Sequence, residues 1–76
     1  MAADVIRVLL DDAFRGDEIS VEDRTGGGDH FQVTVVSASF NELTLIQQHR
    51  LVNAALAAPL ADGSIHELRI RTKGTA

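Results

Sequence analysis

Apolar and polar residues alternate along two short segments in the first half of the chain, Glu18–Asp23 and His30–Ser37. A period of two is typical of a strand with one buried face, and it puts Phe31 on the buried face and His30 on the opposite one. The segment between them, Arg24–Asp29, contains three consecutive glycines. It therefore predicts a mobile hairpin loop that joins two antiparallel strands.

Two other segments repeat their apolar residues with the period of an α-helix. The first spans about residues 4–15, with Asp4 as its predicted N-cap. The second spans about residues 45–58, with Thr44 as its predicted N-cap and Pro59 ending it. The first apolar stripe consists of Ile6, Leu9, Leu10 and Ala13, and the second of Leu45, His49, Val52 and Leu56.

A third strand is predicted over about residues 65–72, where Leu68 and Ile70 share the helix-facing side with His66. The order of elements is thus α-β-β-α-β. A strand–helix–strand connection favours a parallel pair with a right-handed crossover. We therefore predict one small α/β domain of the α+β type over residues 1–76, with a three-stranded mixed sheet and both helices on one face.

The composition restricts the chemistry that this domain can perform. The chain has 76 residues, no cysteine and a net charge of −4. A domain of this size buries one small core, and without thiolates it can form neither a disulfide nor a cysteine metal site of its own. No segment is long and apolar enough for a membrane helix. We expect a protein of the reducing cytoplasm, or of an organelle if a transit peptide precedes Met1.

Three fragments of the chain, in this order and spacing, resemble the BolA family of small proteins. They are Gly27–Phe40 around His30, Gln48–Asn53 on the second predicted helix, and Ser64–Ile70 at the third predicted strand. The resemblance covers about residues 5–72. It implies the same order of elements and the same mixed sheet, an architecture akin to the type II K-homology fold.

His66 is the residue that the resemblance singles out. The resemblance implies that this histidine ligates iron in a [2Fe–2S] cluster shared with a monothiol glutaredoxin of the Cys-Gly-Phe-Ser type. Histidine can replace cysteine as a ligand to one iron of such a cluster. Because the chain has no cysteine, the partner must supply sulfur ligands, and we expect no cluster on the isolated protein. From the residues alone, the alternative is a histidine at the core edge, bonded to a backbone carbonyl.

A second metal ligand from this chain is less clearly marked. Many family members carry a cysteine or an additional histidine in the loop between the first two strands, and Arg24–Asp29 has neither. We assign His30, at the base of this loop, as the second ligand, the alternative being an exposed strand residue. Asp29 offers a hard carboxylate oxygen, which suits a cluster less well than imidazole does. We interpret it as a loop-capping residue.

Four residues are assigned to partner contacts: His49, Arg50, Arg69 and Arg71. The first two belong to a Gln-His-Arg fragment on the helix that the resemblance implicates in partner binding. Arg69 and Arg71 belong to a basic strip on the third strand that also includes Lys73. The alternatives are a core-edge role for His49 and a solvated side chain for Arg50. We expect a monomer that forms a heterodimer with its glutaredoxin.

The predicted function is that of an iron–sulfur cluster and iron-homeostasis adaptor. We predict no enzymatic activity, because the sequence has no cysteine nucleophile, and Ser37 and Ser39 have no histidine nearby in the sequence. A nucleic-acid-binding transcriptional regulator of the BolA type is the alternative, and the basic strip supports it. The net negative charge, the lack of aromatic stacking residues and the missing Gly-x-x-Gly loop weigh against it.

Overall fold

A computed structural model describes all 76 residues of the sequence. Three strands form one mixed sheet in the order β1-β2-β3. β1 (Glu18–Asp23) pairs antiparallel with β2 (His30–Val36), and β2 pairs in parallel with β3 (Glu67–Lys73). β2 is therefore the central strand, and β1 and β3 are the two edges.

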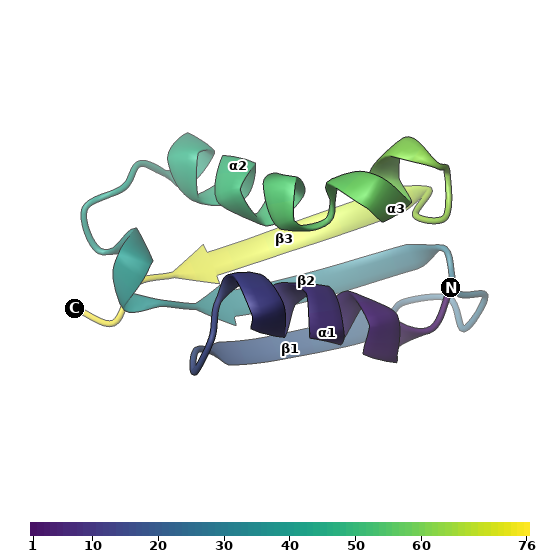
Figure 1. Cartoon of the computed structure of the whole chain (residues 1–76), viewed down its shortest axis with the longest axis horizontal. Helices are drawn as coiled ribbons and strands as arrows, with labels where there is room; N and C mark the ends of the chain where they lie inside the picture. Colours follow the sequence, from purple (N-terminus) through teal and green to yellow (C-terminus); the bar gives the residue numbers. More distant parts are fainter.

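The helices lie on one face of this sheet (Figure 1). α1 (Ala3–Ala13) precedes β1, while α2 (Leu45–Ala55) and α3 (Ala57–Ala61) lie in the crossover between β2 and β3. A short 3-10 helix, η1 (Ala38–Phe40), leads from β2 toward α2. None of these helices has the length and apolar character needed to cross a membrane. The predicted order of elements and the mixed sheet are confirmed, with the second predicted helix divided in two.

The core lies between the helices and the sheet. In β2, Phe31, Val33 and Val35 are fully buried, and the residues between them face the helix-free side. The buried apolar residues are Ile6, Leu10, Phe14, Ile19, Phe31, Val33, Val35, Phe40, Val52, Leu56 and Ile65. The alternation predicted for β2 thus separates a buried face of the sheet from an open one.

The start of α1 differs from the prediction. Ala2, not Asp4, is the N-cap, and no side chain bonds to the first N–H groups of the helix. The helix begins early because Ala3 already packs against the core. At the other end, Ala13 is exposed, and Phe14 is buried with its ring edge-on to Phe40 at 5.5 Å.

Pro59 does not end the second predicted helix. α2 ends at Ala55, Leu56 leaves the helical conformation, and Pro59 is the third residue of α3. The first N–H groups of a helix have no acceptor within it, so a proline is accommodated there. Leu45 also departs from the predicted apolar stripe, because it lies in the first turn of α2 with 61% of its surface exposed.

β3 begins at Glu67, two residues later than predicted, and His66 precedes it. Ile65 is buried in the core and donates its N–H to the carbonyl of Pro59. His66 therefore does not follow the alternation of the strand. Its side chain is 63% exposed at the end of the sheet instead of lying on the helix-facing side.

A capping box fixes the start of α2, as the sequence predicted for Thr44. The Thr44 hydroxyl accepts the N–H of Gln47, and the Gln47 side-chain carbonyl accepts the N–H of Thr44. Two N–H groups at the helix start thereby gain acceptors.

Thr44→Ala should lower the free energy of unfolding by about 1 kcal/mol, because it removes the side-chain acceptor of the capping box. Urea denaturation followed by circular dichroism would report a lower midpoint with an unchanged m value. Thr44→Ser keeps the hydroxyl and should stay close to the parent protein. Equal midpoints for Thr44→Ala and the parent would show that the box does not stabilise α2.

Candidate functional site

The two predicted metal ligands, His30 and His66, meet at one end of the sheet. The parallel register places His30, the first residue of β2, opposite Glu67, the first residue of β3. His66 directly precedes Glu67. The two ring centroids lie 6.2 Å apart, with an angle of 86° between the ring planes. The fold thus brings together two histidines that are remote in the sequence.

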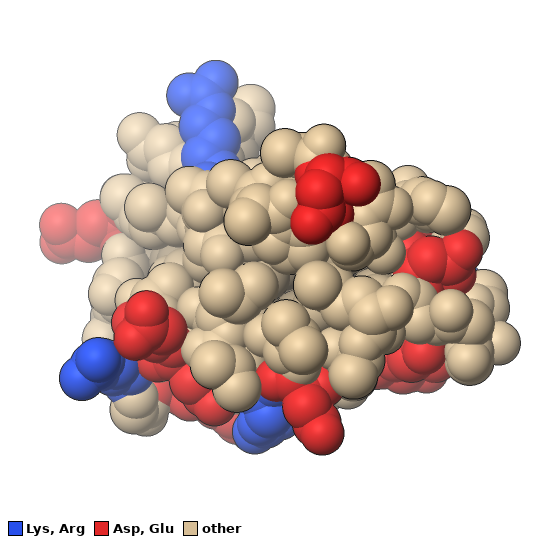
Figure 2. All heavy atoms as spheres, turned by 45° about the vertical axis from the view of Figure 1, so that its right-hand side comes forward, with Lys and Arg blue, Asp and Glu red and all other residues tan.

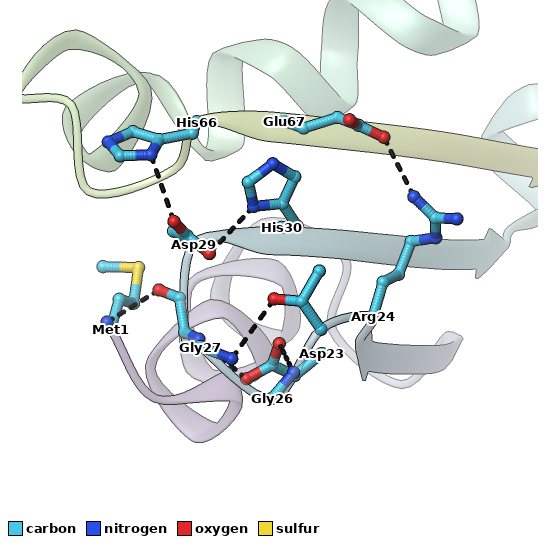
Figure 3. Close-up of polar contacts among 11 residues, drawn as sticks. Met1, Asp23, Arg24, Gly26, Gly27, Asp29, His30, His66 and Glu67 are labelled. Carbon is cyan, nitrogen blue, oxygen red and sulfur yellow. Dashed lines mark hydrogen bonds and ion pairs between the residues drawn. The ribbon is translucent and has the colours of Figure 1, made fainter.

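Asp29 lies between the two imidazole rings (Figure 3). One of its carboxylate oxygens is 2.8 Å from Nδ1 of His30, and the other is 3.1 Å from Nδ1 of His66. Its backbone carbonyl accepts the N–H of His66. The interpretation of Asp29 as a loop-capping residue is wrong, because both carboxylate oxygens are directed at the histidines.

The loop is capped by Asp23, the last residue of β1. Its carboxylate accepts the N–H groups of Gly26 and Gly28, while Gly27 donates to the Thr25 hydroxyl. The backbone of Gly26 and Gly28 has positive φ, 77° and 76°, a conformation that glycine adopts readily. Each glycine N–H therefore has an acceptor. The mobility predicted for this loop stays a prediction.

The two histidines differ in accessibility. The side chain of His66 is 63% exposed and that of His30 is 33% exposed. Both rings turn Nδ1 toward Asp29 and Nε2 away from it (Figure 3). His66 therefore presents its outer nitrogen to an approaching molecule more openly than His30 does.

These contacts also set the charge at this end of the sheet. The hydrogen bond with His30 is the largest cause that holds the pKa of Asp29 below its ordinary value of 3.8. Desolvation of the carboxyl group acts in the opposite direction, and the positive charge of either ring, when protonated, lowers the pKa further. The Asp29 carboxylate is therefore ionised at neutral pH and acts only as an acceptor.

The neighbouring charged side chains are paired with one another. Glu67 contacts Arg24 at 3.0 Å and Arg69 at 3.1 Å. Arg69, a predicted partner-binding residue, is thus engaged within the molecule on the helix-free face. Ion pairs as exposed as these contribute at most about 1 kcal/mol. A partner carboxylate can therefore replace Glu67 at Arg69 without a large penalty.

His49 and Arg71 lie near the opposite end of β3. They line a groove of about 440 Å³ between α2 and the last residues of the strand. The groove is lined by Thr34, Val36, Leu45, His49, Ile70, Arg71, Thr72 and Lys73. Arg50 is exposed on α2 and does not line the groove. The predicted partner-binding residues thus do not form one cluster with His66.

The fold and the paired histidines define a small α+β domain with its candidate ligands at the end of a mixed sheet. A family model described as "BolA-like protein" matches residues 9–76, and the chain belongs to this family. Among solved structures, the BolA domain of SufE1 from Arabidopsis thaliana is similar with a TM-score of 0.85 and 30% identity, covering 96% of this chain and 91% of that one. The predicted fold is thereby confirmed.

Two curated relatives show the range of names in the family. BolA-like protein 1 of Homo sapiens is 37% identical over an alignment 78 residues long, and the alignment covers 93% of this chain and 56% of the relative. The DNA-binding transcriptional regulator BolA of Vibrio cholerae is 40% identical over an alignment 82 residues long, and the alignment covers 99% of this chain and 76% of the relative. The chain thus spans just over half the length of the human relative.

A carboxyl-detected NMR titration should give Asp29 a midpoint below 3.8. A carboxyl group whose pKa is lower in the folded than in the unfolded protein stabilises the fold above the unfolded pKa, and this stabilisation disappears as the pH falls through the folded pKa. The contact between Asp29 and the two rings should therefore persist at neutral pH and be lost only in acid below that ordinary value.

His30→Ala tests the cause of this lowered pKa, because it removes the hydrogen bond that contributes most. The Asp29 midpoint should then move up toward 3.8. Asp62 serves as the control within the same spectrum, because its pKa is lowered by hydrogen bonds from Ser64. An Asp29 midpoint that does not respond to His30→Ala would contradict the hydrogen bond seen here.

Proposed function

We propose that this domain is an iron–sulfur adaptor that shares a [2Fe–2S] cluster with a monothiol glutaredoxin, with His66 as its ligand to one iron. The observation that carries the proposal is the exposed ring of His66, held at Nδ1 by Asp29, in a chain of the BolA-like family. An imidazole held in this way keeps Nε2 available to a metal.

The donor set of the chain fits one histidine-ligated iron and does not fit a cluster held by this chain alone. Such clusters take four ligands, and Rieske centres use histidine on one of the two irons. The chain offers two imidazoles at the end of its sheet and has no cysteine. It has no group of three His, Cys, Asp or Glu side chains arranged to hold a metal ion. The sulfur ligands are therefore assigned to the cysteine and the glutathione of the glutaredoxin.

His30 is proposed as the second contact to the cluster. It shares the Asp29 carboxylate with His66 and lies on the helix-free face, where its side chain is 33% exposed. In the free domain, however, Nε2 of His66 points away from His30 (Figure 3). A contact from both rings to one cluster thus requires a shift of the loop that precedes β2.

The proposed partner contacts extend from His66 along β3. Arg69 and Arg71 emerge on the helix-free face of the strand, because Leu68 and Ile70 pack toward the core. His49 adds a half-buried imidazole in the groove beside α2. These side chains suit a partner surface that carries carboxylates, and the pair is proposed to be a heterodimer.

Co-expression with the monothiol glutaredoxin of the same host should give a coloured heterodimer, whereas the chain alone should be colourless after anaerobic reconstitution. His66→Ala should alter the visible absorption and circular dichroism of the shared cluster and speed its loss by about 10-fold or more. Because His66 is exposed and lies outside β3, the variant should unfold at the same urea concentration as the parent.

Ser64→Ala is the matched control, because it changes a side chain two residues away whose hydrogen bond goes to Asp62 and to neither ring. Its complex should keep the parent spectrum. Two results would overturn the proposal: a stable [2Fe–2S] spectrum on the chain alone, or an unchanged spectrum and rate of cluster loss with His66→Ala. If His66→Ala unfolds, the residue has a structural role instead.

Nucleic-acid binding is the second candidate function. It is favoured by the basic strip of Arg69, Arg71 and Lys73, which share the helix-free face of β3, and by the name of the Vibrio cholerae relative. Against it, the net charge is −4 and Arg69 already contacts Glu67. Figure 2, turned by 45° from the helix-side view of Figure 1, shows Lys and Arg side chains scattered among carboxylates, so the face in this view adds no basic patch to the strip.

A salt titration of duplex DNA binding separates the two functions. Three phosphate contacts from the strip would give a slope of log K against log salt of about −2.7, and Arg71→Ala would make that slope less steep by about 1. From the net charge we expect only weak binding, with a dissociation constant of about 10⁻⁴ M or higher at physiological salt. Tight binding with the full slope would favour the regulator.

A further inference from the structure

We propose that Asp29 is a positioning residue that fixes the tautomer and the direction of two imidazole rings, so that His30 and His66 both present Nε2 as a ligand. The meaning of this arrangement for a metal cluster rests on the proposed function. The arrangement itself belongs to the free domain and can be tested there.

Three oxygen atoms of Asp29 hold the two histidine segments together. Each of its two carboxylate oxygens contacts one ring, at 2.8 Å from Nδ1 of His30 and 3.1 Å from Nδ1 of His66. Its backbone carbonyl accepts the N–H groups of His66 and Glu67 at 2.8 and 3.2 Å. The backbone contacts place the His66 segment beside the loop, and the carboxylate then orients both rings.

The residue before Asp29 is itself closely constrained. Gly28 has a φ of 76°, and its N–H donates to the Asp23 carboxylate at 3.0 Å. A Cβ at Gly28 would lie only 2.7 Å from the carbonyl oxygen of Met1. This close approach requires glycine, and it fixes the point from which the Asp29 side chain extends toward the rings.

The chemistry of a carboxylate decides which ring nitrogen carries the proton. An ionised carboxylate accepts hydrogen bonds and donates none, so each Nδ1 that it contacts must carry hydrogen. A neutral ring in that tautomer has its free lone pair on Nε2, which faces away from Asp29 in both histidines (Figure 3). A carboxylate behind a ligating histidine also raises the basicity of the ring and holds its orientation.

Asp29→Asn discriminates this role from a general effect of shape. The asparagine side chain has nearly the same size, but it offers one acceptor oxygen and one donor nitrogen. It can therefore hold at most one of the two rings in the tautomer with hydrogen on Nδ1. The second ring must release the contact or accept from the amide through a bare Nδ1.

Long-range proton–nitrogen NMR spectra of the isolated, ¹⁵N-labelled domain would show this directly. At pH of about 8.5, two units above the ordinary histidine pKa, both His30 and His66 should carry hydrogen on Nδ1. In Asp29→Asn at least one of them should carry it on Nε2. Glu67→Gln is the matched control, because it removes a neighbouring carboxylate that contacts arginines and not Nδ1, and its tautomers should equal those of the parent.

The inference is overturned if either ring of the parent carries hydrogen on Nε2, or if Asp29→Asn leaves both tautomers unchanged. The parent spectrum alone decides the first outcome, so the test holds even if Asp29→Asn does not fold. His49 lies near the other end of β3, and its ring, observed in the same sample, is the internal reference for the tautomers of His30 and His66.

Cluster loss from the heterodimer with the glutaredoxin separates this inference from the proposed function. Asp29→Asn should speed the loss about 10-fold, while Glu67→Gln should not. If the tautomers behave as predicted but His66→Ala leaves the cluster unchanged, the proposed function fails and the orientation by Asp29 stands. If His66→Ala speeds the loss and Asp29→Asn does not, Asp29 is not a positioning residue for the ligand.

Discussion

Parallel pairing of β2 with β3 is the constraint on which the rest of the structure depends. Parallel neighbours cannot be joined by a tight turn, so the chain crosses over through α2 and α3. Both strands then begin at the same end of the sheet, and the loop before β2 lies next to the segment before β3. The Asp29 carbonyl makes the first contact between them, with the N–H groups of His66 and Glu67. The candidate site is a direct product of this pairing.

The same pairing gives the two faces of the sheet different properties. Because β2 lies between two strands, Phe31 and its apolar neighbours along the strand are fully buried beneath the helices. The helices lie on one face of the sheet (Figure 1), and the other face is left with the polar residues of all three strands. Glu67 and Arg69 emerge there beside His30. A partner that approaches this face contacts charged side chains and an imidazole ring, and it does not contact the buried core.

The alternation of β1 and β2 and the cap at Thr44 could be predicted from the sequence, because neighbouring residues decide each of them. The alternation predicts the wrong face for His66, because contacts between remote segments set the start of β3. The Asp29 carbonyl accepts the N–H of His66, and Ile65 is buried in the core. Only one of the two contacts of Asp29 could be predicted from neighbouring residues. A carboxylate next to His30 is visible in the sequence, but the second ring arrives only through the parallel register.

One partner can reach both groups of predicted contacts. His66 and Arg71 are five residues apart, or about 16 Å along an extended strand. A standard interface covers about 800 Å² of each protein and is about 30 Å across if circular, and the accessible surface of this domain is 4660 Å². His66, Arg69 and the groove at His49 therefore fit beneath a single partner that lies along the free edge of β3. Because the groove is distant from His66, the proposed partner contacts at His49 and Arg71 are separate from the proposed cluster ligand. Under the proposed function, such a separation would let the heterodimer outlast the loss of its cluster, which is the property an adaptor needs if it hands the cluster on.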